Sequence, residues 1–394
     1  MTLDMANSLM SLPDMDRTPL ASGLALCAWY RAGHRDLPWR HTSDPYRILV
    51  SEIMLQQTRV ETVIGYYGRF LEAFPDVRAL AEAPVERVMA LWQGLGYYSR
   101  ARNLQEAAKA VMARHDGQFP AWEDALLALP GIGPYTAGAV MSIAYGQSVP
   151  AVDGNVLRVM ARLCQIEEDI LQARTRNRIV EAVRHMIPEG MASDFCQGMM
   201  ELGATVCTPT SPRCDACPFI PDCLARRAGR QAELPNRKAK TPPVESHQAV
   251  IVLRDNGGRV LLAWRETGLL AGMWGLPHVE AEAESPDGED LQAMLETQTG
   301  LRLPGRIVVH GSAGSYRHIF SHRIWHVRVW LADFLKDKEV NENAEGYKWL
   351  EAKELTRMPI PEAFRKALRA ADLDAKAPAR GRSTGSGGSM DILA

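Results

Sequence analysis

The stretch LPGIGPYTAGAVMSIAYGQSVPAVDGNVLRV, residues 129–159, joins a glycine-rich helix turn to a single carboxylate, Asp153. Gly131 and Gly133 permit a positive φ and a close approach of the backbone, so amides of the turn can point at one phosphate. Pro134 suits the first position of the next helix, whose N-terminus favours an anion. Such a turn can hold DNA without reading its sequence. A plain helix-turn-helix corner would also use these glycines, so the turn alone does not establish DNA binding.

The composition is that of a globular chain long enough for two or three domains, with 394 residues, 46% of them hydrophobic and 23% charged. The formal net charge of −2 gives no overall attraction to DNA, so DNA binding would have to come from local basic patches and backbone amides. The sequence has no run of about 18 apolar residues, and residues 1–20 have no signal-like apolar core. We therefore expect a cytoplasmic protein that does not enter a membrane.

Two kinds of pattern follow one another along the chain. Residues 21–225 repeat apolar side chains every three or four positions, which predicts an all-helical domain after an N-terminal extension over 1–20. The basic, proline-containing segment 226–245 indicates an exposed linker. Beyond it, QAVIVLR and RVLLAWR flank the hairpin turn DNGG, and further strand and helix patterns predict an α+β domain over 246–372. Residues 373–394 are rich in Gly and Ser, which predicts a disordered tail.

The stretch 129–159 resembles the helix-hairpin-helix plus aspartate motif of the endonuclease III superfamily of DNA repair glycosylases. Within that superfamily, SEIMLQQT at residues 51–58 resembles the signature of MutY-type adenine DNA glycosylases. The resemblance covers about residues 20–370 and is strongest over 45–225. It implies a multidomain protein, in which an all-α helix-hairpin-helix glycosylase domain with an iron–sulfur loop is followed by an α+β Nudix-like domain.

Glu52 lies in the middle of that signature, among apolar neighbours. Periodicity alone favours an exposed glutamate on the polar face of a helix. A buried carboxyl would instead be desolvated, which raises its pKa and keeps it protonated near neutral pH as a general acid. The resemblance implies the buried state, in which this glutamate protonates the target adenine and later helps to activate water.

Asp153 supplies a second carboxylate. One neutral acid and one ionised carboxylate are what cleavage of a glycosidic bond through an oxocarbenium-like transition state requires. Asp153 also suits the N-cap of the helix that follows, and an N-cap aspartate stays ionised in the helix dipole. By resemblance, Asp153 stabilises the sugar cation, either as a charge or through a transient covalent bond, while Asn155 and Tyr135 position the catalytic groups.

Tyr135 also separates two reaction types. In bifunctional members of the superfamily the corresponding position is a lysine, whose amine attacks the sugar and leads to strand cleavage through a Schiff base. The motif here is GIGPYTAG, so the resemblance implies a monofunctional glycosylase that leaves an abasic site. Two alternatives stay open, an endonuclease III-like lyase acting on oxidised pyrimidines and a non-catalytic DNA-damage binder.

An adenine inside a duplex has to be flipped out of the stack before it can react. Gln57 and Tyr97 match family positions that intercalate around the purine opposite the target. Helix packing is the other interpretation of Tyr97, although the basic segment 99–102 beside it favours DNA contact. By the same resemblance, the adenine pocket includes Arg35, Trp39, Arg40 and Gln197.

Four cysteines are crowded between residues 207 and 223, with six, two and five residues between successive members. In a reducing compartment such a group indicates a metal rather than disulfides. Spacing alone allows either zinc or iron and sulfur, because both accept tetrahedral sulfur ligands. The spacing also matches the iron–sulfur loop of endonuclease III-type glycosylases. The resemblance therefore implies a [4Fe–4S] cluster held by Cys207, Cys214, Cys217 and Cys223.

The second domain resembles a Nudix hydrolase, whose signature helix carries an arginine and several glutamates that bind magnesium. Alignment on Gly300 places at those positions Ala293, Met294, Thr297 and Gln298. Without clustered acids there is no Mg²⁺ site for pyrophosphate hydrolysis. The resemblance implies instead a reader of 8-oxoguanine, with an ordinary strand end as the other interpretation. The residues expected to contact the damaged base are Phe320, Ser321 and His322.

The resemblance as a whole implies a monomeric adenine DNA glycosylase. Its expected partner is double-stranded DNA that holds adenine opposite 8-oxoguanine or, with lower efficiency, opposite guanine. The helical domain would extract and hydrolyse the adenine, and the second domain would test whether the opposite base is oxidised.

Overall fold

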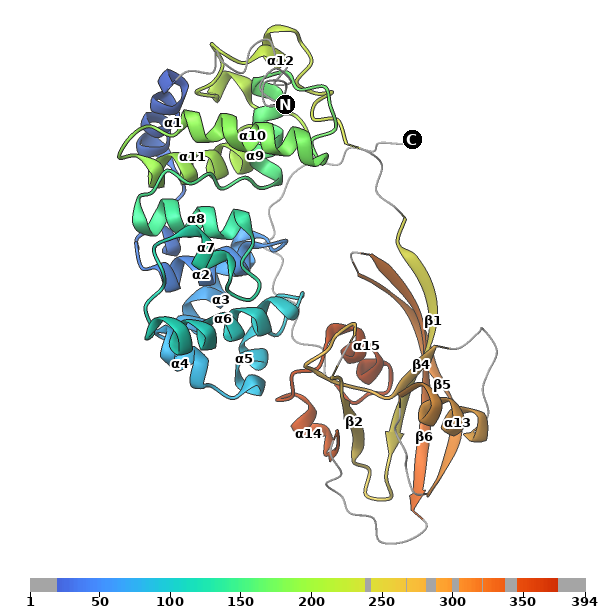
Figure 1. Ribbon diagram of the computed structural model, residues 1–394. Helices are drawn as coiled ribbons and strands as arrows, with labels where there is room; N and C mark the ends of the chain where they lie inside the picture. Colours follow the sequence, from blue (N-terminus) through green and yellow to red (C-terminus); the bar gives the residue numbers. More distant parts are fainter. Residues whose placement is uncertain are drawn as a thin grey trace, which may run out of the picture. The chain divides into compact units, whose positions relative to one another are not determined.

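The computed structural model describes residues 20–237, 242–266, 268–280, 288–299, 305–320, 322–336 and 346–374. The chain divides into two compact units, Met1–Thr241 and Pro242–Ala394 (Figure 1). The first unit is helical and the second is built on a sheet, so the expected fold class is confirmed. Among the described helices, none combines the length and the apolar composition that crossing a bilayer requires. Of the expected extension over 1–20, residues 1–19 lie outside the described residues, and Leu20 begins α1. Of the expected tail over 373–394, residues 375–394 lie outside them.

The helical unit is a set of helices joined by short turns. Their bounds are α1 (Leu20–Gly33), α2 (Pro45–Leu55), α3 (Val60–Ala73), α4 (Val77–Glu82), α5 (Val85–Trp92), α6 (Ser99–His115), α7 (Glu123–Leu127), α8 (Pro134–Tyr145), α9 (Gly154–Leu163), α10 (Ala173–Met186), α11 (Ala192–Thr205) and α12 (Leu224–Arg227), with 3-10 turns η2 (Pro38–Arg40) and η3 (Cys214–Ala216).

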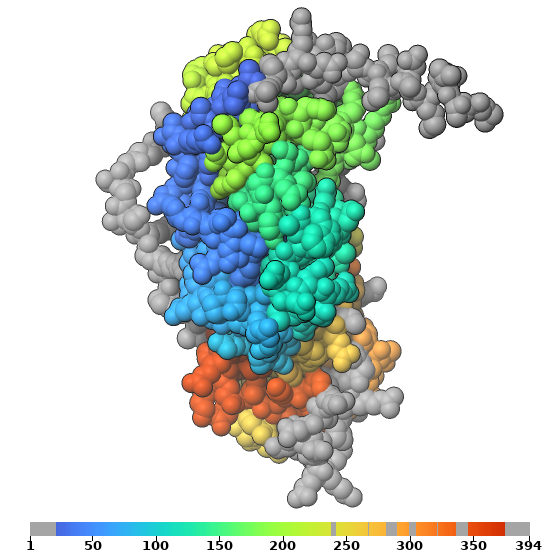
Figure 2. Space-filling model, turned by 60° about the vertical axis from the view of Figure 1, so that its left-hand side comes forward, coloured from blue at the N-terminus to red at the C-terminus, as the bar shows by residue number. Residues whose placement is uncertain are grey.

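These helices form two groups within the unit, α2 to α6 on one side and α1 with α9 to α12 on the other (Figure 1). Helix α8 lies between the groups and packs against both α2 and α11. The chain returns on itself, because α1 at the start of the unit packs against α11 near its end, as the neighbouring blue and yellow-green segments show (Figure 2). The glycine turn before α8 and the aspartate before α9 are thereby placed at the seam between the groups.

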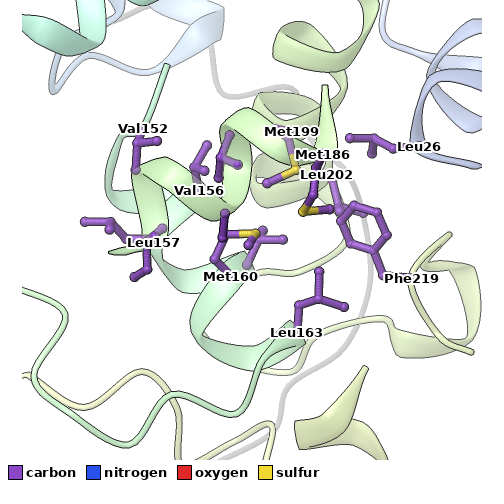
Figure 3. Packing of buried hydrophobic residues seen from close by; sticks show 14 of the residues in the cluster. Leu26, Val152, Val156, Leu157, Met160, Leu163, Met186, Met199, Leu202 and Phe219 are labelled. Atoms are coloured by element: carbon purple, nitrogen blue, oxygen red, sulfur yellow. The ribbon is translucent and has the colours of Figure 1, made fainter. Parts of the chain in front are cut away.

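A shared apolar core attaches the cysteine-rich loop to the helices. Helix α9 carries Val156, Met160 and Leu163 at intervals of four and three, so these side chains lie on one face. They pack with Leu202 of α11 and with Phe219 of the loop, all nearly inaccessible to solvent (Figure 3). Burial of a side chain of this size contributes about 1.5–3 kcal/mol. The loop between Cys207 and Cys223 is therefore part of the folded core and not an appendage.

The expected linker over 226–245 is wrong for its first half. Residues 228–237 fold back on the helical unit, where Leu234 is only 2% exposed. The carbonyl oxygen of Leu234 accepts a hydrogen bond from Arg162 Nε at 2.9 Å, and the amide of Ile170 donates to Asn236. Burial of Leu234 and hydrogen bonds to the backbone carbonyls hold this segment on the helical unit despite its basic composition. The chain therefore stays on the helical unit up to residue 237.

The second unit is a mixed sheet with helices on both faces. Its elements are β1 (Val244–Arg254), β2 (Val260–Trp264), β3 (Trp274–Gly275), β4 (His278–Glu280), β5 (Gly305–Ile319), β6 (Arg323–Lys336), β7 (Tyr347–Leu350), α13 (Gly288–Thr299), α14 (Ala352–Leu355) and α15 (Glu362–Ala370). The strand order is β3-β2-β1-β6-β5, with β4 paired to β1 and β7 paired to β2. Strands β1 and β6 are parallel, whereas β1 and β2 form the expected antiparallel hairpin.

Side chains of β1 point alternately to the two faces of the sheet, so this one strand contributes to two hydrophobic cores. Val250 and Val252 face the core that contains α15, whereas Ile251 and Leu253 face the core that contains α13. Successive side chains of a strand point to opposite faces of the sheet, so a continuous apolar run is required when both faces are covered. The run AVIVL in the sequence is that signal.

Candidate active site

Helix α2 buries a carboxyl group in the helical unit. The helix begins at Pro45 and is capped by Asp44, whose side chain accepts a hydrogen bond from the amide of Tyr46 at 2.8 Å. Glu52, in its second half, is only 4% exposed, so the exposed position favoured by periodicity is wrong. Burial raises the pKa of Glu52 to about 7, with a further increase from Asp153, while Tyr135 and Arg40 lower it.

The hydroxyl of Tyr135 donates a hydrogen bond to Glu52 Oε2 at 2.7 Å. Tyr135 is the second residue of α8, directly after the glycine turn, and burial raises its pKa well above the usual range. The phenol is therefore a donor in this pair. Because helix α8 lies at the seam between the groups, a residue 83 positions from Glu52 is brought onto the same carboxyl group.

Asp153 is the N-cap of α9 and also lines the cavity that contains Glu52. Its Oδ1 accepts hydrogen bonds from the amides of Asn155 and Val156, each at 2.8 Å. Its Oδ2 accepts a third from the side-chain amide of Asn155, also at 2.8 Å. These donors and the N-terminus of α9 stabilise the negative charge of the carboxylate. The capping role and a site role therefore coexist in one residue.

One cavity of about 500 Å³ brings the expected groups together. Its size falls within the range of small-ligand pockets. It is enclosed by α2, the start of α8, the start of α9 and α11. Nine residues singled out in the sequence line it, namely Arg35, Trp39, Arg40, Glu52, Gln57, Tyr135, Asp153, Asn155 and Gln197.

Glu201 of α11 organises the arginine side of this cavity, and it was missed in the sequence. It is 2% exposed and accepts a bidentate interaction from Arg35 Nε and Nη2 as well as a bond from Arg40 Nη2 at 2.7 Å. Burial raises the pKa of Glu201, but the bonds from Arg35 and Arg40 outweigh it and lower the pKa to about 2. The available signal was its spacing of four from Gln197, which places both on one face of α11.

Internal contacts also fix the aromatic and amide groups of the cavity. Trp39 is 7% exposed, in η2, with its ring edge-on to Tyr67 at 5.6 Å between centroids. Gln197 accepts a hydrogen bond from the hydroxyl of Tyr30 at 3.0 Å and donates one to Ser193 at 3.1 Å. The orientation of the Gln197 amide is thereby set before any ligand enters.

Gln57 and Tyr97 are both exposed and both left-handed, with φ of 56° and 47°. Such values are unusual for residues that have a Cβ, and they tend to occur at functional positions. Gln57 lines the cavity, whereas Tyr97 is not among its lining residues. The expectation that the basic segment beside Tyr97 contacts DNA is wrong for Arg100, which is 8% exposed and points into the protein.

The two glycines of the turn differ from each other. Gly131 has a φ of 75°, and a Cβ there would lie 2.5 Å from Asn103 Cβ. Gly133 has a φ of −99°, so it does not use the positive φ that a glycine permits. As the N-cap of α8, Gly133 adopts an ordinary extended conformation, and a Cβ there would meet nothing within 4 Å. Gly131 is needed for the fold of the turn, whereas Gly133 leaves open space at the start of α8.

The four cysteines of the loop line one small cavity, together with Arg162. Arg162 Nη1 donates a hydrogen bond to Cys207 Sγ at 3.3 Å. Within the described residues, no group of three or more His, Cys, Asp or Glu side chains is placed to hold a single metal ion. Four thiols on a common cavity are a donor set that either zinc or an iron–sulfur group accepts.

A hydrogen-bond chain leads from Asp153 to this loop. Asn155 holds Asp153 and accepts a bond from Arg158 Nη2 at 2.9 Å. Arg158 Nε donates to the carbonyl oxygen of Cys207 at 2.8 Å. Arg158 was also missed in the sequence, where the only signal was its spacing of three from Asn155 on the same helix.

In the second unit, the helix expected to lack a magnesium site is α13. Gln298 uses its amide to pair with the backbone of Glu280, at 2.9 and 3.0 Å, and Thr297 bonds to the carbonyl of Ala293. Met294 is partly buried against the core. Gln298 and Met294 therefore support the fold of the unit, whereas the side chain of Ala293 is exposed.

The segment expected to read 8-oxoguanine joins β5 and β6. Phe320 is partly buried, with its ring edge-on to Trp325 at 5.0 Å and to His318 at 4.6 Å. His322 is exposed. Ser321 lies outside the described residues. The structure therefore assigns Phe320 a packing contact and leaves the base contact as a prediction.

Similarity to known proteins covers both units. Residues 50–185 match the HhH-GPD superfamily of base excision DNA repair proteins, and residues 249–370 match the NUDIX domain. The adenine DNA glycosylase of Homo sapiens is 34% identical over 400 residues, covering 88% of this chain and 73% of that protein. The adenine DNA glycosylase of Arabidopsis thaliana is 36% identical over 346 residues, which cover 76% of this chain and 55% of that protein. The structure of a thermostable thymine-DNA glycosylase, 29% identical with a TM-score of 0.48, covers 52% of this chain and 95% of that one.

Proposed function

This chain belongs to the adenine DNA glycosylase family, and on that premise we propose that it removes adenine opposite 8-oxoguanine, and less efficiently opposite guanine, without cutting the strand. The observation that carries the proposal is that Glu52 and Asp153 line one cavity, with Tyr135 bonded to Glu52. A neutral acid and an anion on one cavity are the pair that glycosidic cleavage requires. A tyrosine at the place of the lyase lysine supports hydrolysis alone.

The reaction begins with Glu52 in its protonated form. Its proton passes to a ring nitrogen of the flipped adenine while the bond between the sugar and the base breaks, and the bonding electrons leave with adenine. Asp153 faces the oxocarbenium ion that develops on the sugar and stabilises its charge. Water then adds to the anomeric carbon and gives a proton to the Glu52 carboxylate, which restores the acid. Tyr135 and Asn155 hold the two carboxyl groups in place.

Two sets of residues bind the substrate in this proposal. Arg35, Arg40 and Gln197 present N–H groups and an amide to the edge of the adenine, next to the Trp39 ring. The turn around Gly131 and Gly133 contacts a phosphate through backbone amides at the start of α8. The exposed side chains of Gln57 and Tyr97 enter the space that the flipped base leaves. Their exposure and their left-handed conformation support this assignment.

We also propose that the cysteine loop holds a [4Fe–4S] cluster through Cys207, Cys214, Cys217 and Cys223. The common cavity of the four thiols and the match of their spacing to the iron–sulfur loop of endonuclease III-type glycosylases support a cluster over zinc. All four ligand positions would be filled by cysteine, so the cluster would shape the loop and its basic residues rather than act on the base. Iron and acid-labile sulfide in the purified protein are expected, and stoichiometric zinc without iron would contradict the assignment.

The second unit is proposed as the reader of the opposite base. The exposed His322 lies between the long strands β5 and β6, where a purine could be contacted, and Ser321 precedes it in the sequence. Ser321→Ala and His322→Ala should reduce the preference for 8-oxoguanine over guanine. His310→Ala, which removes an exposed histidine elsewhere on β5, is the matched control. An unchanged preference in the two turn variants would exclude this turn as the reader.

Single-turnover excision on four duplexes tests the proposed function as a whole. The duplexes carry adenine opposite 8-oxoguanine, adenine opposite guanine, adenine opposite thymine, and an oxidised pyrimidine. We expect excision to be fastest with 8-oxoguanine, slower with guanine and absent with the other two. Borohydride should trap no covalent protein–DNA complex. Excision of the oxidised pyrimidine, or efficient trapping, would favour the lyase instead.

A further inference from the structure

Arg100, in the first turn of α6, is a buried cation that the proposed chemistry does not use. Arg100 is only 8% exposed, and burial lowers the pKa of its guanidinium to about 10. In the part of the chain that the structure describes, no carboxylate forms an ion pair with Arg100. A buried charge without a counter-ion is costly unless its N–H groups find other acceptors, and here Nη1 and Nη2 find them whereas Nε has none among the described residues.

Carbonyl oxygens from two separate segments surround the guanidinium. Nη1 donates to the carbonyls of Ile53 and Met54, at 2.8 and 3.0 Å, and to that of Gln56. These are free acceptors at the C-terminal end of α2. Nη2 donates to the carbonyls of Leu95 and Gly96, each at 3.1 Å, in the loop before α6. One planar side chain thus joins the end of α2 to a loop about forty residues away.

The two segments are those that carry Gln57 and Tyr97, which are exposed and have a positive φ. The carbonyl of Gln56 belongs to the peptide that precedes Gln57, and the carbonyl of Gly96 belongs to the peptide that precedes Tyr97. Arg100 therefore fixes the orientation of both peptides, each of which directly precedes a residue with a positive φ. Its Cζ also lies 5.4 Å from the centroid of the Tyr97 ring. Such conformations persist only where neighbouring groups determine them.

We propose that Arg100 is the positioning residue that sets Gln57 and Tyr97 in one arrangement, so that both side chains enter the duplex together. This inference rests on the proposed function, in which these two residues occupy the space around the flipped base. Arg100 acts through them and does not contact DNA. A lysine would keep the charge but lose the planar group of donors that reaches both segments at once.

A double-mutant cycle tests the inference on the full chain. Arg100→Lys and Arg100→Gln are each made in the wild type and in the Gln57→Ala/Tyr97→Ala background; if the glutamine variant does not fold, the lysine variant carries the test. The readouts are the single-turnover excision rate with adenine opposite 8-oxoguanine, the affinity for undamaged duplex and the thermal midpoint. Gln105→Met is the matched control, because Gln105 is equally buried on α6 but donates to the carbonyls of α4 and the following turn.

In the wild type we expect Arg100→Lys to slow excision about tenfold while the affinity for undamaged duplex is unchanged. In the background that lacks Gln57 and Tyr97, the same change should slow excision by less than about twofold, because the residues through which Arg100 acts are gone. Equal fractional losses in both backgrounds, or the same pattern in Gln105→Met, would overturn the inference. If removal of Gln57 and Tyr97 itself leaves excision unchanged, it is the proposed DNA contact that fails.

Discussion

The carboxylate of Glu201 lies 2.7 Å from the guanidinium of Arg40, and both side chains are almost completely buried. This pair stands next to the group that is proposed to donate the proton. The charged and titratable groups that affect Glu52 are Tyr135, Asp153 and Arg40, and the positive charge of Arg40 works against its protonation. Glu201 binds Arg40 and Arg35 together, so its negative charge offsets much of that influence.

Replacement of Glu201 by Gln should therefore change the pH dependence of excision. The charge of Arg40 would be uncompensated, and we expect the pKa of Glu52 to fall by about one unit. Glu52 must be protonated to act, so the alkaline limb of the single-turnover rate should move to lower pH. Asp194→Asn is the control, because it removes an exposed ion pair of the same helix. A loss of equal size at every pH would mean that Glu201 supports packing alone.

Glu52→Gln should separate activity from stability. Excision should nearly stop while DNA affinity is kept, because an amide has the shape of the acid but cannot supply the proton. Burial raises the pKa of Glu52 from 4.5 to about 7 in the folded state, so the wild type loses stability as pH rises through this interval. Above pH 7 the variant should be more stable by a few kcal/mol, on the order of 3, and the gain should vanish below about pH 4.5. Denaturant titrations at both pH values measure this difference, and excision at the normal rate would remove Glu52 from the mechanism.

The residues that could be recognised in the sequence are those whose signal is local. Asp153 stands directly before a helix and in a motif, the glycines punctuate a turn, and AVIVL has the composition of a strand covered on both faces. Glu201 could not be recognised in this way, because its partner Arg35 is 166 positions away. A carboxylate between polar and apolar neighbours on a helix is typical of a surface residue. Only the folded structure shows that two arginines bind Glu201 inside the protein.

At Arg100 a local pattern is present, but it predicts the wrong contact. A basic residue beside a tyrosine pair is typical of a DNA contact, but its acceptors are backbone carbonyls, which leave no trace in side-chain composition. The same holds for residues 228–237, where a segment with a basic composition is held by the buried side chain of Leu234 and by hydrogen bonds to the helical unit. Local patterns therefore predicted the helices and strands, and the family resemblance singled out the two carboxyl groups, whereas the residues that support them depended on contacts between distant segments.

Tyr135→Phe should shift the pH dependence in the direction opposite to Glu201→Gln. The hydrogen bond from Tyr135 favours the ionised form of Glu52, so its removal should raise the pKa of Glu52 further, by about one unit. The alkaline limb of excision should move to higher pH, while the maximal rate falls because the carboxyl group is less well oriented. Tyr145→Phe is the control on the same helix, since its hydroxyl bonds only to the carbonyl of Phe119 in the described contacts. A limb that moves downward would contradict the assigned direction.

The two glycines of the turn before α8 give a test that separates folding from DNA binding. Gly131→Ala places a Cβ in a left-handed conformation, which costs about 1–2 kcal/mol, and brings it against Asn103. We expect its denaturant midpoint to fall. Gly133→Ala meets open space in an extended conformation, so its stability cost should stay below about 1 kcal/mol. If backbone amides of this turn hold a phosphate, the added methyl group at position 133 should weaken binding to undamaged duplex about tenfold at constant salt. Wild-type affinity in that variant would exclude a phosphate at the turn, since no atom of the described residues lies within 4 Å of a Cβ at position 133.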